Sequence, residues 1–287
     1  MSESCEICAL VSAPDDAREL REAGATRIYL DVIDREPAEG LADEVRRGLV
    51  VPVLDEVCRE GDHARLDPWV MEGRSVAVGN VSELALACER GALAEARGCI
   101  PAHNAAALRA LDAMGACLAW LSPELSLGQM CRLARAGALP VGACVFGRPR
   151  LMTCEHCALQ VAYACDRDHA SCPYRYKSHW LVNIDERALP VRTDGRGRSR
   201  VYLDEPVDLV PEALELARAG VGRLLVDARN VPLEQAARGV GRCVRALAGE
   251  AVEREGCVGL SERGVELGAC LPTACPRSRI RGFAAYL

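Results

Sequence analysis

Aromatic residues and long apolar runs are both scarce in this chain. Phe, Trp and Tyr make up only 4% of the 287 residues, although 50% of the residues are hydrophobic. No apolar segment approaches the ~20 residues that a helix needs to cross a bilayer. The start, MSESCEICAL, lacks the basic residues and the apolar run of a signal peptide. We therefore expect no membrane span, a cytoplasmic location, and a core built from aliphatic side chains.

An excess of positive charge is also missing. The chain has 41 Asp and Glu against 35 Lys and Arg, which gives a formal net charge of −6. That balance excludes a global basic surface, so we expect no DNA partner. A local basic patch remains possible, and with it an RNA substrate.

Cysteine, by contrast, is abundant, with 16 residues. In a cytoplasmic protein these are not a disulfide framework, because that compartment keeps thiols reduced. Most of them lie in apolar contexts that are typical of small buried side chains. A closely spaced subset is the better candidate for holding a metal.

A pattern of helix, Ala-Gly break and aliphatic strand recurs along the chain and predicts a parallel sheet. Eight strands are expected, the number that closes a TIM-like (β/α)8 barrel. They are predicted at 5–11, 27–31, 49–54, 75–80, 98–103, 117–121, 140–147 and 222–228. We expect residues 1–287 to form one barrel domain of class α/β.

The connection after the seventh strand is unusually long and reads as an insertion of about 148–210. Its second part, HWLVNIDERALPVRTD, has two apolar runs around a polar turn, which predicts a β-hairpin over 179–193. Its first part, LMTCEHCALQVAYACDRDHASCP, carries four cysteines in a short polar segment.

Two thiolates two residues apart can bind one metal, and two more from a nearby loop can complete a four-sulfur shell. The predicted ligands are Cys154, Cys157, Cys165 and Cys172. His156 and His169 lie between them and are expected to pack or hydrogen-bond beside the site. The spacing alone leaves iron–sulfur and Zn²⁺ open.

In a barrel of this kind, ligands bind at the carboxyl ends of the strands. The substrate-binding candidates at that end are Asp31, Asp55, His103, Glu124, Arg148 and Arg229. The two arginines suit an anionic substrate, but ordinary salt bridges explain them equally well. Asn104, beside His103, is expected to cap the following helix.

Several segments together resemble the peptidase U32 family, named for collagenase-like peptidases. They are ALVSAPDDARELREAGATRIYL, VAVGNVSELALA, AHNAAALRAL, LSPELSLGQM, VFGRPRLMTCEHC and LVNIDERALPVRTDGRGRSRVYLDEPVDL. The resemblance covers nearly the whole length, and the combination is far more specific than any single motif.

The resemblance implies a [4Fe-4S] cluster and a redox enzyme for oxygen-independent hydroxylation of an RNA base or an aromatic or quinone ring. It also implies an RNA or small-molecule substrate and, in some cases, a paralogous U32 partner subunit. One alternative is a collagenase-like peptidase, although no Ser/His/Asp, Cys/His or zinc-protease signature is visible. The other is a non-catalytic, metal-stabilised partner subunit.

The family pattern transfers only in part. Cys157, Cys165 and Cys172 fall where the family has cluster cysteines, but its fourth cysteine would fall at Gly197. Cys154 is the predicted replacement and Cys58 the reserve. An acidic residue that the family often has early in strand seven is replaced by Gly142.

Overall fold

A computed structural model describes residues 5–35, 37–163, 169, 171–175, 177, 179–182 and 186–257. The chain divides into two compact units. The barrel unit lies in Met1–Gly147 and Val207–Ser261, and the insert unit lies in Arg148–Pro206.

The barrel unit is built on a closed ring of eight parallel strands, since β1 pairs with β2 and β13 while β7 pairs with β6 and β13. The strands are β1 (Glu6–Val11), β2 (Arg27–Asp31), β3 (Val50–Val53), β4 (Ser75–Val78), β5 (Leu93–Ala96), β6 (Leu118–Trp120), β7 (Val141–Gly147) and β13 (Val221–Asp227). A further short strand, β12 (Val207–Asp208), pairs antiparallel with β7 outside the ring. The predicted (β/α)8 fold class is confirmed.

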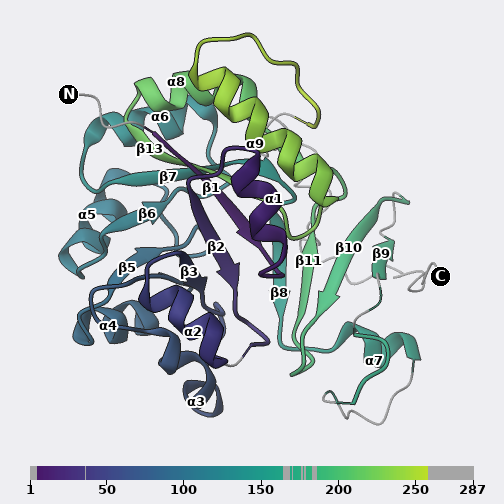
Figure 1. Cartoon of the computed structure of the whole chain (residues 1–287). Helices are drawn as coiled ribbons and strands as arrows, with labels where there is room; N and C mark the ends of the chain where they lie inside the picture. Colours follow the sequence, from purple (N-terminus) through teal and green to yellow (C-terminus); the bar gives the residue numbers. More distant parts are fainter. Residues whose placement is uncertain are drawn as a thin grey trace. The chain divides into compact units, whose positions relative to one another are not determined.

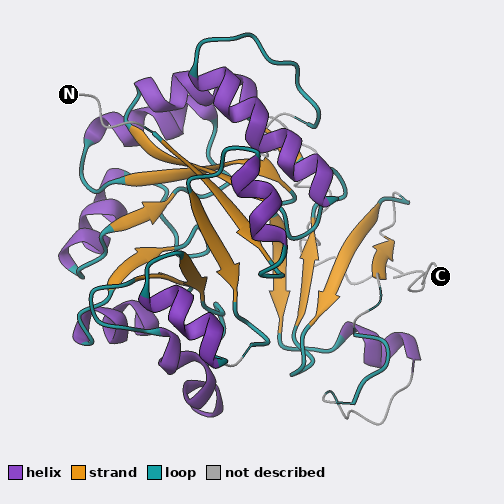
Figure 2. Ribbon diagram, viewed as in Figure 1, coloured by secondary structure: helices purple, strands orange, loops and turns teal. Residues whose placement is uncertain are grey.

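Helices surround these strands, as Figures 1 and 2 show. They are α1 (Asp16–Glu22), α2 (Glu39–Arg46), α3 (His63–Leu66), α4 (Val81–Glu89), α5 (Ala105–Ala113), α6 (Leu127–Ala136), α8 (Ala213–Arg218) and α9 (Leu233–Leu247), with 3-10 turns η1 (Glu60–Asp62), η2 (Asp67–Trp69) and η3 (Val210–Glu212). Asn104 caps α5 as expected, because its Oδ1 accepts the N–H of Ala107 at 2.9 Å. Among the helices in the described ranges, none has the length and apolarity needed to cross a bilayer.

The inside of the ring combines an apolar cluster with one buried carboxylate. The cluster contains Cys8, Leu10, Tyr29, Val51, Val53, Ala77, Leu118 and Trp120. Glu95 on β5 is fully buried and accepts hydrogen bonds from Tyr29 Oη (2.7 Å), Arg223 Nη1 (2.7 Å) and Trp120 Nε1 (3.3 Å). Arg27 also approaches it, with Nη2 at 3.4 Å from Oε1. The carboxylate is thus compensated by cationic and neutral donors from three strands, β2, β6 and β13.

The predicted position of the fifth strand, 98–103, is wrong: β5 is Leu93–Ala96. Its sequence, LAEA, consists of strong helix formers with a charge among them, so it carries no strand signal. The strand forms because Ala94 and Ala96 are buried and Glu95 meets donors inside the ring. Tertiary partners override the local preference here.

The insert unit contains a four-stranded antiparallel sheet in the order β8-β11-β10-β9. Its elements are β8 (Arg150–Cys154), α7 (Ala158–Tyr163), β9 (His179–Val182), β10 (Ala188–Thr193) and β11 (Ser199–Tyr202). The pairing of β9 with β10 confirms the predicted hairpin. A small apolar cluster of Leu189, Val191 and Val201 holds this sheet together.

Removing the buried carboxylate is expected to destabilise the barrel. Glu95→Ala leaves the Arg223 guanidinium without its fully buried partner, which typically costs about 3–5 kcal/mol. Urea unfolding followed by circular dichroism measures the loss. The matched control is Glu6→Ala, which removes the more exposed partner of Arg223 at 2.7 Å and should cost about 1 kcal/mol or less. Equal losses in the two variants would contradict the central role of Glu95.

Candidate functional site

The carboxyl ends of the barrel strands carry two ion-paired groups from the predicted set. Arg229 binds Asp227 through two bonds, Nε to Oδ1 at 2.9 Å and Nη2 to Oδ2 at 2.7 Å, and reaches Asp31 Oδ2 at 3.0 Å. His103 Nε2 lies 3.5 Å from Glu124 Oε2, and both side chains are exposed. The structure therefore brings Asp31 together with Arg229 and His103 together with Glu124.

The other two predicted substrate residues have different surroundings. Asp55 is fully buried, and its Oδ1 accepts the N–H of Val57 at 3.2 Å. Arg148 belongs to the insert unit, where its guanidinium donates to the carbonyls of Leu203 (3.2 Å) and Asp204. Arg148 is therefore bound to backbone within its own unit, which favours a structural role. Substrate contact by any of the six residues stays a prediction.

Glu83 is a titratable group at this end that the sequence interpretation missed. It follows β4 on helix α4, is only 3% exposed, and accepts the N–H of Gly79 through Oε2 at 3.0 Å, while Oε1 has no partner among the described residues. Burial raises the pKa of Glu83 to about 7, with Asp55 and Glu56 adding to the effect, although the Gly79 bond and Arg97 oppose it. The Asn80-x-x-Glu83 spacing was a helix-start signal that could have indicated this carboxyl.

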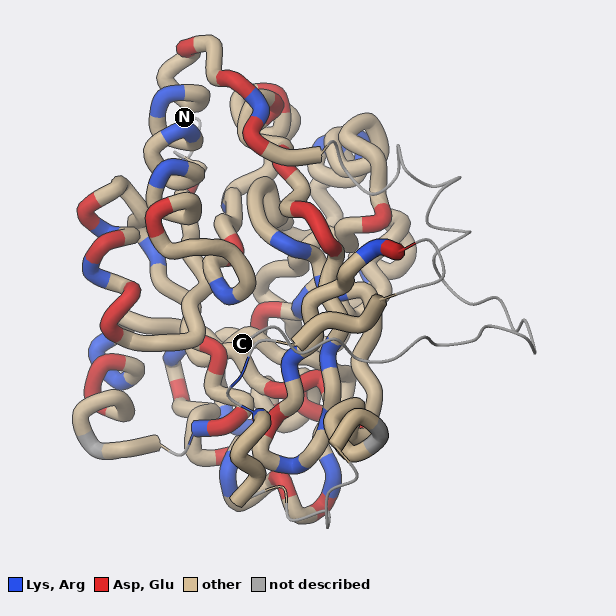
Figure 3. The backbone as a smooth tube through the Cα atoms, turned by 90° about the vertical axis from the view of Figure 1, so that its right-hand side faces the viewer, with Lys and Arg blue, Asp and Glu red and all other residues tan. Residues whose placement is uncertain are grey.

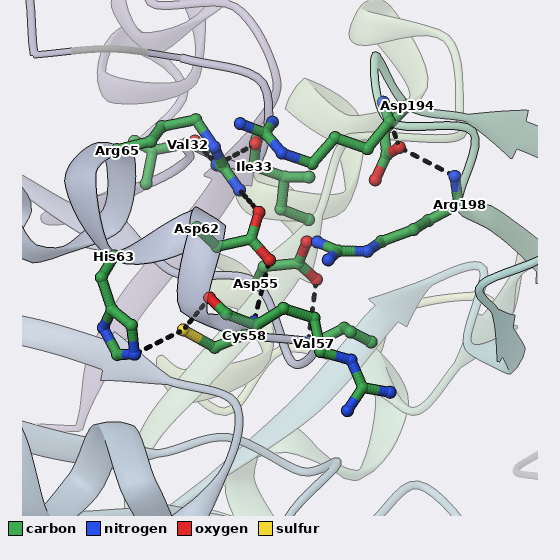
Figure 4. Close-up of polar contacts among 12 residues, drawn as sticks. Val32, Ile33, Asp55, Val57, Cys58, Asp62, His63, Arg65, Asp194 and Arg198 are labelled. Carbon is green, nitrogen blue, oxygen red and sulfur yellow. Dashed lines mark hydrogen bonds and ion pairs between the residues drawn. The ribbon is translucent and has the colours of Figure 1, made fainter. Parts of the chain in front are cut away.

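A thiol–imidazole–carboxylate series follows β3. Cys58 Sγ lies 4.0 Å from His63 Nε2, and His63 Nδ1 lies 3.0 Å from Asp67 Oδ1. Figure 4 shows the sulfur facing the imidazole ring. No local signature in the sequence marks this set, because its Cys-x4-His-x3-Asp spacing matches no familiar motif.

The insert unit holds the predicted metal ligands that the structure describes. Cys154 ends β8 and is half-buried, Cys157 precedes α7 and is 5% exposed, and Cys172 is half-buried. Cys165 lies outside the described residues. Among the residues that are described, no three His, Cys, Asp or Glu side chains are arranged to hold a metal ion.

Two of these cysteines lie at the same end of the insert sheet. Cys154 is directly opposite Ser199 in the β8–β11 pairing. The hydroxyl of Ser199 accepts the N–H of Ala158 at 2.9 Å, which fixes the start of α7 next to Cys157. Cys154 Sγ accepts the N–H of His156 at 3.3 Å.

Two glycines stand where the family resemblance expects ligating or acidic residues, and both are crowded by a ring. At Gly197, with φ +79°, an added Cβ would lie 2.4 Å from His169 Cε1. At Gly142 an added Cβ would lie 2.6 Å from Cε3 of Trp120. A side chain at Gly197 requires the His169 ring to move, and one at Gly142 requires the Trp120 ring to move. With both rings where they are, a cysteine does not fit at position 197 and an acidic residue does not fit at position 142.

In the part of the chain that the structure describes, Lys and Arg alternate along the backbone with Asp and Glu in the view of Figure 3. The formal net charge of the sequence is −6.

Comparison with known proteins gives one family match. A model of peptidase family U32 matches residues 98–268 of the 287. None of the curated proteins compared with the chain matches it.

Solved structures resemble the chain only distantly. "The Structure of the U32 Peptidase Mk0906" has a TM-score of 0.38 and 15% identity, covering 52% of this chain and 71% of that one. "Native KDPGal structure" has a TM-score of 0.47 and 10% identity, covering 85% and 94%. The thiamine phosphate pyrophosphorylase from Pyrococcus furiosus has a TM-score of 0.44 and 12% identity, covering 86% and 98%.

The buried Glu83 carboxyl makes stability depend on pH. Its folded pKa of about 7 lies above the ordinary 4.5, so the folded state binds more protons between these values. The free energy of unfolding should therefore fall as pH rises from 4.5 to 7, by on the order of 3 kcal/mol, and then level off.

Urea unfolding at pH 5 and pH 8 measures this loss. Glu83→Gln should abolish most of it, whereas Glu89→Gln, which changes an exposed carboxylate on the same helix, should leave it intact. A pH dependence that is the same in all three proteins would refute the assignment to Glu83.

Proposed function

Because the chain belongs to peptidase family U32, we propose that it is an iron–sulfur protein for oxygen-independent hydroxylation of an RNA base or an aromatic or quinone ring. The observation that carries the proposal is the group of cysteines on the insert unit. The chemical class of the reaction comes from the family resemblance of the sequence. An RNA or small-molecule substrate and a paralogous U32 partner subunit belong to the same proposal.

The donor set fits a thiophilic metal centre. Cys154, Cys157, Cys165 and Cys172 are the proposed ligands, and thiolates are the ligands that iron–sulfur clusters use. The N–H of His156 directed at Cys154 Sγ is the kind of contact that tunes such a centre. When bound, a [4Fe-4S] cluster supplies electron transfer, and with an open iron position it supplies a site for oxygen transfer.

The position of the His169 ring supports the proposal that Cys154 replaces the family's fourth ligand in this chain. The ring fills the space beside Gly197 where a cysteine side chain would begin. Cys154 pairs with Ser199, which follows Gly197 by two residues in the sequence, and this supports Cys154 as the source of a sulfur at the same end of the sheet. Substrate binding is assigned to the carboxyl ends of the barrel strands, where Arg229 and His103 place polar groups.

Anaerobic purification followed by iron, sulfide and zinc analysis tests the proposal. We expect about four iron and four sulfide ions per chain, lost in Cys157→Ser and retained in Cys117→Ser, which changes an exposed barrel thiol. A colourless protein that contains zinc would favour the metal-stabilised partner subunit instead. A chain that takes up neither metal would overturn the proposal.

The fourth ligand has its own test. We expect Cys154→Ser to lose iron and His169→Ala to keep it, because the proposed role of His169 is packing against Gly197. The visible absorbance and the iron content of each variant are the two measurements. The reverse result would make His169 the ligand and Cys154 a structural thiol.

A further inference from the structure

The segment between β3 and β4 holds three side chains in the order thiol, imidazole, carboxylate. The Cys58 Sγ to His63 Nε2 distance is 4.0 Å, and Figure 4 shows these two side chains. The His63 Nδ1 to Asp67 Oδ1 distance is 3.0 Å. A nucleophile within reach of a base, with the base oriented by a third group, is the arrangement of nucleophilic catalysis. The distance between Cys58 Sγ and His63 Nε2 is longer than that of a strong hydrogen bond. Catalytic hydrogen bonds are often long in the absence of substrate and shorten when it binds.

Local structure fixes the carboxylate and the imidazole. His63 opens α3 and Asp67 follows it one helical turn later, so the two side chains share a face. Arg90 holds Asp67 from the other side, with Nη2 at 2.9 Å from Oδ2 and Nη1 at 2.7 Å from the backbone carbonyl. Asp67 is therefore anchored, and it orients the His63 ring with Nε2 free to meet the sulfur.

The loop that carries the thiol is also held in place. Arg59 donates its backbone N–H to Asp62 Oδ2 at 2.9 Å, closing the turn between Cys58 and α3. Asp62 in turn binds Arg65 Nη2 at 3.2 Å, and the Arg65 guanidinium donates to the carbonyls of Val32 and Ile33. These contacts tie the turn to the segment after β2, at the carboxyl ends of the strands.

The electrostatic surroundings keep the thiol neutral at rest. Burial raises the pKa of Cys58 to about 11, and Glu83, Asp62, Asp67 and Asp55 add to the effect. At pH 7 the thiol is then protonated, so attack requires a base that removes the proton during the reaction. His63 is the exposed imidazole in contact with this sulfur.

We propose that Cys58, His63 and Asp67 form an acyl-transfer site that hydrolyses an ester or amide carbonyl. Cys58 Sγ attacks the carbonyl carbon while its proton passes to His63 Nε2. The C–O or C–N bond breaks, the leaving group takes that proton, and the acyl group remains on Sγ as a thioester. Water gives a proton to His63 and releases the acyl group as a carboxylic acid, which restores the thiol.

This activity goes beyond the metal-dependent function proposed above and uses only barrel-unit residues. It also gives the peptidase alternative a specific chemical basis that the sequence alone did not provide. The competing explanation is that His63–Asp67 is only a helix-stabilising pair and Cys58 an unrelated thiol. Failure of the acyl-transfer proposal can be distinguished from failure of the metal proposal. Acyl transfer to Cys58 tests the former, and the iron content of the protein tests the latter.

The test uses the full chain with p-nitrophenyl acetate as the ester probe. We expect a burst of p-nitrophenol, and mass spectrometry of the acid-quenched protein should find the acetyl group on Cys58. Cys58→Ser should abolish the burst. Cys99→Ser, which removes an exposed thiol after β5, should retain it.

Two further variants separate catalysis from structure. His63→Ala should slow the burst about 100-fold and lower the peptide-resolved rate of iodoacetamide labelling at Cys58, and Asp67→Asn should slow the burst less. Thermal melting identifies any variant that has lost its fold, and only folded variants are compared. Cys58→Ser should keep the iron and sulfide content of the unmodified protein.

Three results would overturn the inference. One is acetylation elsewhere with Cys58 unmodified. Another is labelling of Cys58 that does not change in His63→Ala. The third is loss of iron in Cys58→Ser, which would make Cys58 a metal ligand, the reserve role that the sequence left open.

Discussion

The Glu95 carboxylate inside the ring is the constraint on which the barrel depends. A carboxylate taken out of water is costly unless charges and hydrogen-bond donors surround it. Arg223, Tyr29 and Trp120 supply those donors from β13, β2 and β6. Because the donors come from strands around the ring, the charge is satisfied only when the ring is closed. The interaction thus favours the closed barrel over open arrangements of the same strands.

The two ends of the barrel carry different sets of polar contacts. Arg27 and Ser75 begin their strands, and their 2.7 Å hydrogen bond lies at the amino ends. Asp31, Asp227 and Arg229 end or follow theirs, so their ion pairs lie at the opposite end. Functional residues in barrels of this kind gather at the carboxyl ends, whereas the amino ends serve stability. The buried Glu95 group therefore belongs to the fold, and the Cys58 and Arg229 groups belong to the end where ligands bind.

How much the sequence could predict depended on whether local and tertiary preferences agreed. The barrel strands other than β5 are mostly aliphatic, and those after β1 follow a break that contains glycine, so they could be predicted closely. The LAEA strand could not, because its stability comes from donors on β2, β6 and β13 that no local pattern reveals. The Asn104 cap was predictable because capping is a local interaction. The His169 ring beside Gly197 was not, since a contact across a loop leaves no trace in spacing.

Burial keeps several thiols of the barrel unit protonated. Desolvation raises the pKa of Cys144 and of Cys243 to about 12. Thiols held neutral in this way are poor nucleophiles and poor metal ligands, because both roles require the thiolate. Cys58 has a pKa in the same raised range, so its ionisation alone does not set it apart. The difference lies in its neighbour: His63 can accept the proton that burial otherwise retains on sulfur. In the proposed site, the Cys58 thiol becomes reactive because His63 lies beside it. Its reactivity therefore depends on the position of this base and not on a low thiol pKa.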